Sequence, residues 1–153
     1  MASDRKHGNN PVKSYFDKLS TSSKRINVLG FLNPQTNDLY PFIVEGRVDT
    51  KVVIECFEAF SKTLTKPTIV ILDNAPVHTS KLFMEKIDKW QERGLFIYQL
   101  PAYSPALNTI EILWRNIKTR WLPIGAYESL DSLKKAIEDI LINYGSKYQI
   151  HFA

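Results

Sequence analysis

Two acidic residues, Asp73 and Glu111, stand at positions that suit a divalent cation site. Asp73 follows an uninterrupted apolar run that ends at Leu72, and Glu111 lies near the start of an amphipathic segment. Mg²⁺ is bound in proteins through one or two carboxylates and keeps several waters, which a substrate phosphate displaces. Two such ions, about 4 Å apart, activate the attacking water and stabilise the leaving oxygen when a phosphodiester is cleaved. Because every chain holds many carboxylates, the pair indicates this chemistry without identifying it.

Both acids also have ordinary structural interpretations. Asp73 and Asn74 follow a strand, where such side chains often close an Asx turn. Asn108 and Glu111 have the spacing of a capping box, in which two side chains satisfy free backbone N–H groups at a helix start. Glu111 also stands four residues before Arg115, the spacing of a surface ion pair on a helix. The residues alone leave these interpretations open beside the metal site.

The stretch that must position Asp73 is the apolar run from Thr68 to Leu72. Its β-branched residues predict a strand covered on both faces, which is typical of a central strand in an α/β sheet. Asn74 and Pro76 end this strand. In open α/β sheets, functional groups gather beyond the carboxyl ends of the strands, so we expect Asp73 to face a crevice from a rigid support.

Hydrophobic periodicity and turn residues predict the remaining elements. Asp49 or Thr50 caps the first helix, Gly94 stops the second, and Asn108 caps the third. Two prolines exclude a regular element from 100–108. In chain order we expect strand 26–32, strand 39–44, helix 50–64, strand 68–73, helix 80–93, strand 95–100, helix 108–121 and helix 129–144. An antiparallel hairpin followed by alternating strands and helices predicts an α/β fold, with a mixed sheet flanked by helices.

Length and composition fit one globular domain. The chain has 153 residues, of which 44% are hydrophobic and 24% charged, enough for an ordered core. No window of about 18 apolar residues, the length of a membrane span, occurs. The single cysteine, Cys56, allows no internal disulfide, which fits a reducing compartment. It lies in an apolar-periodic stretch, so we interpret it as a core residue.

Positive charge gathers at the amino-terminal end. The net charge is +4, and residues 1–25 hold six Lys or Arg against two Asp or Glu. We interpret 1–25 as a basic flexible arm that meets phosphates, or as a truncated start. Residues 26–153 form the folded domain in this interpretation.

Three segments together make the sequence recognisable. They read LDNAPVH at 72–78, LPAYSPALNTIE at 100–111 and ILWRNIK at 112–118. With its flanking segments, over about residues 24–152, the chain resembles the DDE transposases, in particular the bacterial insertion-sequence transposases related to mariner elements. The resemblance implies an RNase H-like fold and a triad of acidic residues that holds Mg²⁺ (or Mn²⁺). Asp73 matches the second acid and Glu111 the third, with 37 residues between them.

The same resemblance implies a function. It is metal-dependent DNA cleavage at element ends and strand transfer to a target, as in DNA transposition. DNA is then the partner, together with a homodimer mate or a full-length transposase subunit, and no membrane is involved. The implied location is the bacterial cytoplasm, at the nucleoid.

The amino-terminal part departs from the family pattern. The family's first acid lies on a strand before the one at 26–32, and Asp17 is only a superficial match for it. We therefore expect the fold to lack its first strand, and the chain to be a catalytic-domain fragment that does not cleave DNA by itself. Ala102, Ala106 and Thr109 depart from the family's usual residues but remove no metal ligand. A second hypothesis is a catalytically dead remnant that only binds DNA or another transposase subunit.

Four residues near the acids are candidates for DNA contact: His78, Tyr103, Arg115 and Lys118. His78 lies in the loop after Asp73, where it could instead orient a carboxylate or pack the loop. Tyr103 could equally pack its loop on the sheet. Arg115 and Lys118 lie off the apolar face of their helix, where basic side chains can meet phosphates.

Overall fold

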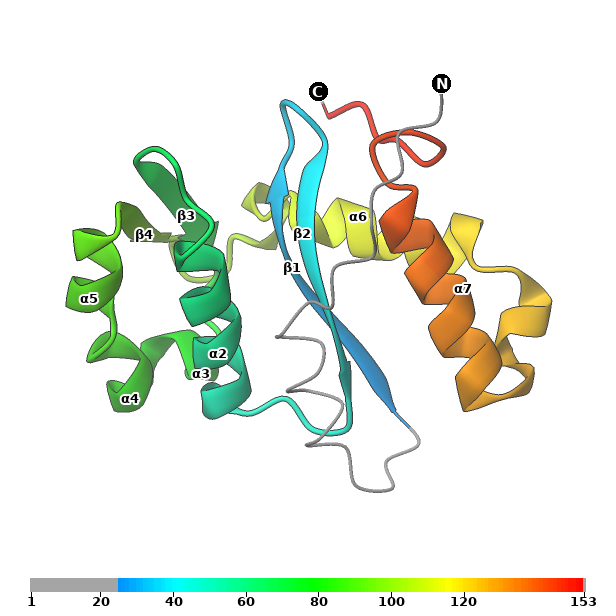
Figure 1. The fold of residues 1–153 in the computed structure, drawn as a ribbon, viewed down its shortest axis with the longest axis horizontal. Coiled ribbons are helices and arrows are strands. Elements are labelled where there is room, and N and C mark those ends of the chain that lie inside the picture. Colours follow the sequence, from blue (N-terminus) through cyan, green and yellow to red (C-terminus); the bar gives the residue numbers. More distant parts are fainter. Residues whose placement is uncertain (1–24, 153) are drawn as a thin grey trace.

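The computed structural model describes residues 25–152. Its elements, in chain order, are β1 (Ile26–Asn33), β2 (Asp38–Glu45), α2 (Thr50–Ser61), β3 (Thr68–Leu72), α3 (Pro76–Thr79), α4 (Lys81–Met84), α5 (Ile87–Glu92), β4 (Leu95–Gln99), η1 (Pro105–Leu107), α6 (Ile110–Asn116), η2 (Ile117–Trp121), η3 (Ile124–Glu128) and α7 (Leu130–Ile142). In Figure 1 the hairpin β1–β2 stands between β3–β4 with α2 to α5 on one side, and α6 and α7 on the other. Except for Arg25, the predicted arm 1–25 lies outside the described residues, and so does Asp17.

The predicted hairpin is confirmed. β1 and β2 pair antiparallel, from Ile26 opposite Glu45 to Asn33 opposite Asp38. The connecting turn places Asn37 at a φ of 59°, in the left-handed region that asparagine tolerates better than most residues. The first strand ends at Asn33, one residue after the predicted range 26–32. The second runs from Asp38 to Glu45, one residue longer at each end than the predicted range 39–44.

The second ladder contains the strand that carries Asp73. β3 and β4 pair parallel and in register, from Thr68 beside Leu95 to Leu72 beside Gln99. The predicted helix 80–93 between them is wrong as one element, because the chain forms α3, α4 and α5 instead. Ser80 has an extended backbone, and its hydroxyl accepts the N–H of Phe83, so Ser80 caps a new helix. The predicted stop at Gly94 is confirmed, with a φ of 87°.

The α/β class is confirmed, and small sheets flanked by helices are consistent with an RNase H-like fold. The strands do not form one continuous sheet, however: within residues 25–152 the two ladders are separate. The prediction that β3 is covered on both faces is also wrong, because Ile69 and Ile71 are 69% and 56% exposed. Their neighbours on β4, Phe96 and Tyr98, are exposed as well. Among residues 25–152, helices pack on only one face of this ladder, and the apolar residues of the other face are exposed.

The main core lies between α2 and the β3–β4 ladder. Asp49 caps α2 by accepting the N–H of Val52 at 3.0 Å, as predicted. The helix ends at Ser61, before the predicted Leu64. There the hydroxyl of Ser61 donates to the carbonyl oxygen of Glu58, and the hydroxyl of Thr63 donates to that of Phe60. The buried residues of this core are Val53, Ile54, Phe57, Leu72, Phe83, Trp90 and Leu95.

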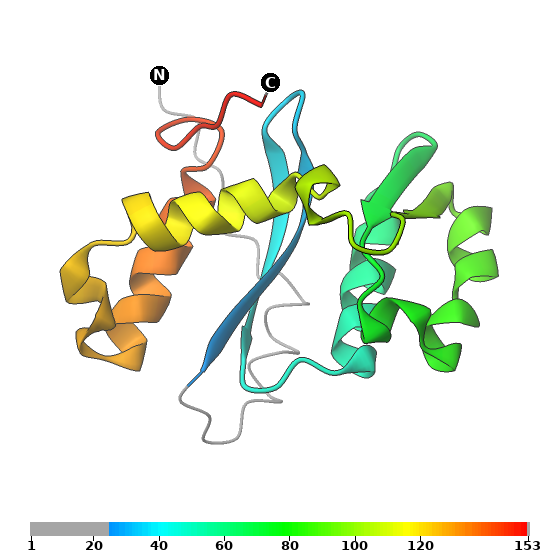
Figure 2. The ribbon, with the colours of Figure 1, turned by 180° about the vertical axis from the view of Figure 1, so that it is seen from behind.

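A second core joins the carboxyl-terminal helices to the hairpin. Figure 2 shows α6 running across β1–β2, with α7 beside it. A Cβ on Gly30 of β1 would lie 3.3 Å from Cη2 of Trp114, so glycine permits this close approach of α6. The predicted helix 108–121 begins at Ile110 and turns π-helical from Ile117. The buried residues here are Leu113, Ile117, Ile137, Ile140 and Leu141. No helix in the described part of the chain has the length and apolar character needed to cross a bilayer.

Candidate functional site

Asp73 is held at the carboxyl end of β3 by the turn that follows. Its Oδ1 accepts the backbone N–H of Ala75 at 3.2 Å, so the Asx turn that the sequence allowed does form. The side chain is nevertheless 47% exposed. The turn therefore fixes one carboxylate oxygen without removing the group from solvent.

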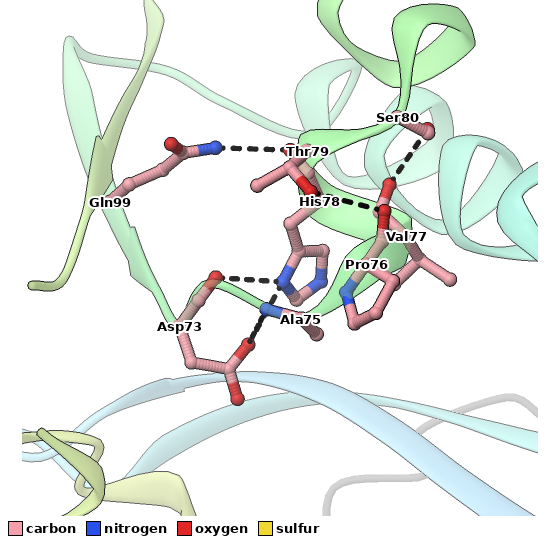
Figure 3. Close-up of polar contacts among 8 residues, drawn as sticks. All are labelled: Asp73, Ala75, Pro76, Val77, His78, Thr79, Ser80 and Gln99. Atoms are coloured by element: carbon pink, nitrogen blue, oxygen red, sulfur yellow. Dashed lines mark hydrogen bonds and ion pairs between the residues drawn. The ribbon is translucent and has the colours of Figure 1, made fainter. Parts of the chain in front are cut away.

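His78 makes the second contact with this carboxylate. Its Nδ1 lies 3.0 Å from Oδ1 of Asp73 and 3.1 Å from the carbonyl oxygen of the same residue (Figure 3). Both partners are acceptors, so the contact is attractive when Nδ1 carries a proton that it donates. Oδ2 of Asp73 makes no hydrogen bond with any residue between 25 and 152. One oxygen is thus held by two donors, and the other is available to a ligand.

The histidine itself is held from three directions. Its ring contacts the rings of Phe57 and Phe83 at centroid distances of 6.5 and 5.6 Å. Its carbonyl oxygen accepts Nε2 of Gln99 at 3.0 Å, across from the end of β4 (Figure 3). Sequence reasoning missed Gln99, although its polar side chain ends an otherwise apolar strand next to β3. This packing and hydrogen bonding leave the His78 side chain 19% exposed.

Glu111 lies in the first turn of α6, and neither structural alternative for it is formed. Thr109 rather than Asn108 is the N-cap, and no side chain caps the helix. The backbone N–H of Glu111 donates to the carbonyl oxygen of Asn108 at 3.1 Å, so the predicted capping box is absent. The Glu111 carboxylate makes no hydrogen bond or ion pair with a described residue, Arg115 included. It is exposed and available.

The loop between the two acids begins beside Asp73. The N–H of Leu100 donates to the carbonyl oxygen of Leu72 at 2.7 Å, which ties the start of the loop to the end of β3. The expectation of no regular element is corrected by the short 3-10 turn η1. Tyr103 has a φ of 58° and a fully exposed side chain, so it does not pack the loop on the sheet. The loop then leads into the turn that carries Glu111.

Arg115 and Lys118 follow Glu111 along the same helical segment. At spacings of four and seven residues, their side chains share a helical face with Glu111. Both are exposed, and neither forms an ion pair with another described residue. Positive charge therefore lies on the same side of the helix as the free carboxylate.

Asp73 and Glu111 fit a hard divalent cation in chemical type. Each offers a carboxylate oxygen that no described residue uses, and carboxylates are ligands for Mg²⁺ and Mn²⁺. Within residues 25–152, no group of three or more His, Cys, Asp or Glu side chains is arranged to hold a metal ion. The structure thus presents two candidate ligand side chains, each carried by its own element.

Comparison with protein-family models gives a match over most of the chain. A family described as DDE superfamily endonuclease matches residues 4–134, which include both acids and all four candidate DNA-contact residues. The match begins within the segment 1–25. A comparison with curated proteins finds no match.

Proposed function

The chain belongs to the DDE superfamily endonucleases, and from this membership we propose that it is the catalytic domain of a transposase, for metal-dependent DNA cleavage and strand transfer. The family supports a transposase-like nuclease function that acts on DNA. Asp73 and Glu111 are the two acids that we assign to catalysis and to metal binding. In this proposal the parent element is a bacterial insertion sequence related to mariner elements, and the protein acts in the cytoplasm.

The observation that carries the proposal is the state of the two carboxylates. Oδ1 of Asp73 accepts two hydrogen bonds, whereas Oδ2 accepts none from the described residues. Glu111 forms neither the capping box with Asn108 nor the ion pair with Arg115 that a purely structural role would give it. An exposed carboxylate without such partners at a helix start gains only the favourable field of the helix amino terminus, about 0.3–1 kcal/mol. The free Oδ2 of Asp73 and the unpaired carboxylate of Glu111, each at a position that matches the family's motif, are better explained as metal ligands.

Mg²⁺ or Mn²⁺ is the cofactor that we propose for this pair. Bound there, the cation would supply positive charge at the scissile phosphate and lower the pKa of a bound water. The chain's own contribution is to hold one oxygen of Asp73 in the Asx turn and to offer the second. Glu111 contributes a carboxylate from the first turn of α6.

DNA binding is the second part of the proposal. Arg115 and Lys118 contact phosphates beside the metal site, and the exposed ring of Tyr103 contacts the DNA from the loop between the acids. His78 also belongs to this region, although its Nδ1 is already engaged by Asp73. Such contacts position DNA without reading its sequence. The protein partner that we propose is a second copy or a full-length transposase subunit.

A remnant that binds DNA without cutting it is the alternative function. It is favoured by the two-carboxylate site of the described residues, because two divalent cations need more negative charge than two acids provide. In that case the chain acts by occupying DNA or by joining another transposase subunit.

A plasmid-nicking assay with Mg²⁺ or Mn²⁺ separates the two functions. The sequence predicts that the isolated chain does not cleave DNA, so the catalytic function is supported by nicking in the wild-type chain that Asp73→Asn and Glu111→Gln each abolish. Glu128→Gln, at an exposed position on η3, is the matched control and should nick normally. If the wild-type chain binds DNA and does not nick it, the remnant is correct. Nicking that survives both site substitutions would refute the assignment of the acids.

A further inference from the structure

The contact between His78 and Asp73 restrains the Asp73 side chain in addition to packing the histidine ring. Nδ1 of His78 faces two oxygens of one residue, the carboxylate Oδ1 at 3.0 Å and the carbonyl at 3.1 Å. A single imidazole N–H thereby fixes both the side chain and the backbone of Asp73.

The other donor to Oδ1 is weaker in geometry. The N–H of Ala75 reaches Oδ1 at 3.2 Å, at the long end of the range for N–H···O hydrogen bonds. An aspartate on a solvent-facing turn, held by that bond alone, could still turn about its side-chain torsions. The His78 contact adds a second, shorter restraint from another direction.

The support of His78 is itself rigid. Phe83 is fully buried and Phe57 is 5% exposed, so the ring of His78 leans on the main core. The carbonyl oxygen of His78 is bonded to Gln99, and its N–H donates to the carbonyl oxygen of Ala75 at 2.8 Å. The position of the imidazole is therefore set by α2, α4 and β4 together.

We propose that His78 is a positioning residue that locks the Asp73 carboxylate so that Oδ2 faces the metal. This rests on the proposed function, since it assumes that Asp73 is a metal ligand. It assigns His78 a role through Asp73 in place of direct contact with DNA. Hydrogen-bonded partners of metal-binding carboxylates characteristically act in this way.

Two substitutions separate the hydrogen bond from the packing. His78→Phe keeps an aromatic ring against Phe57 and Phe83 and removes the donor. His78→Asn keeps a nitrogen donor at the position of Nδ1 and removes most of the ring. If His78 positions Asp73 through its hydrogen bond, His78→Phe should lose the ordered Asp73 side chain and His78→Asn should keep it. If His78 acts only by packing, His78→Asn should lose that order and His78→Phe should keep it.

The first readout needs no metal. Three-bond couplings to Cγ of Asp73, measured by NMR on the metal-free chain, report whether that side chain occupies one rotamer. The wild-type chain and His78→Asn should show one rotamer, and His78→Phe should show averaging. Averaging in neither variant, or in both, overturns the proposal.

The second readout is Mn²⁺ affinity, measured by the loss of the free-ion electron paramagnetic resonance signal. His78→Phe should raise the dissociation constant by about 10–100-fold, with His78→Asn near the wild-type value. An equal affinity in all three chains overturns the proposal, and so does a loss confined to DNA binding. If the wild-type chain binds no Mn²⁺, the proposed function fails, and the couplings alone then decide whether His78 positions Asp73.

Discussion

The indole nitrogen of Trp90 donates to Oε1 of Glu58 at 3.1 Å, which joins α5 to α2 beneath the buried face of the second ladder. Arg93 donates to the other oxygen, Oε2, at 2.8 Å and to Oγ of Ser61 at 2.9 Å. Lys89 adds a longer ion pair at 3.7 Å. The Glu58 carboxylate of α2 is therefore the common partner of Lys89 and Trp90 of α5 and of Arg93, which directly follows α5.

The first prediction concerns this carboxylate. Burial raises the pKa of Glu58, but hydrogen bonds from Arg93 and Trp90, with the charges of Arg93 and Lys89, outweigh it and leave the pKa below its usual 4.5. A lowered pKa means that the charged form stabilises the fold above pH 4.5, and that this stability is lost as the pH falls through the folded pKa. Glu58→Gln should cost about 1–3 kcal/mol at pH 7, because hydrogen bonds to a charged group are lost.

Urea unfolding of the wild type and Glu58→Gln from pH 7 to pH 3 tests this. The difference in unfolding free energy should shrink below pH 4.5. Glu55→Gln, on an exposed position of the same helix, is the control and should change little. A difference that stays constant down to pH 3 would contradict the assigned role of Glu58.

The second prediction concerns Cys56, which is 2% exposed. Burial, with a smaller contribution from the charge of Glu55, raises the pKa of its thiol to about 12. Because the thiolate is the reactive form, we expect no reaction with a disulfide reagent at pH 8 in the folded chain and full reaction in urea. Since Cys56 is the only cysteine, the signal is unambiguous. Rapid reaction without denaturant would show that α2 is not packed as described.

The third prediction contrasts a buried and an exposed residue of β3. Leu72→Ala should cost about 2–5 kcal/mol of unfolding free energy, because it leaves a cavity in the main core. Ile71→Lys should stay within about 0.5 kcal/mol, because its side chain is mostly in solvent. Thermal or urea unfolding of both variants measures this contrast. A large loss in Ile71→Lys would mean that something covers this face in solution.

Local signals predicted much of the fold. Asp49 and Gly94 act within one turn of their own positions, so their roles as helix cap and helix stop can be predicted from neighbouring residues. The apolar run that ends at Leu72 predicted a strand for the same reason. By contrast, the exposure of Ile71 depends on which elements lie over it. Periodicity shows that a residue is apolar and cannot show what covers it.

The candidate site divides in the same way. The positions of Asp73 and Glu111 after a strand and in a first helical turn were predicted, because both depend on local sequence. The absence of a capping box depends on the backbone of the preceding loop, which makes Thr109 the N-cap. The sequence allowed three roles for His78, and only the fold brings its ring against Phe57 and its Nδ1 onto Asp73.

The fourth prediction is that the carboxylates of Asp73 and Glu111 lie within about 8 Å of each other, near enough to share a metal directly or through water. The hydrogen bond from the N–H of Leu100 to the carbonyl oxygen of Leu72 starts the connecting loop at the end of β3 that Asp73 follows. In a chain with Asp73→Cys and Glu111→Cys, a short bifunctional thiol reagent should link the two positions rapidly. Each single substitution serves as the control. If the two cysteines are linked no faster than in urea, the two positions lie far apart in the folded chain, and the shared metal site is refuted.

The last prediction concerns DNA binding by the basic face of the α6 segment. The chain should bind duplex DNA without sequence preference, with a dissociation constant of roughly 10⁻⁴–10⁻⁶ M at physiological salt. Arg115→Gln and Lys118→Gln should each lower the slope of log affinity against log salt by about 0.9, the contribution of one phosphate contact. Lys135→Gln is the matched control, because Lys135 is exposed on α7 but already paired with Asp131 at 3.0 Å. A salt titration by fluorescence anisotropy gives the slopes. If all three variants keep the wild-type slope, the face beside Glu111 does not meet the phosphate backbone, and the DNA must approach the two acids from another side.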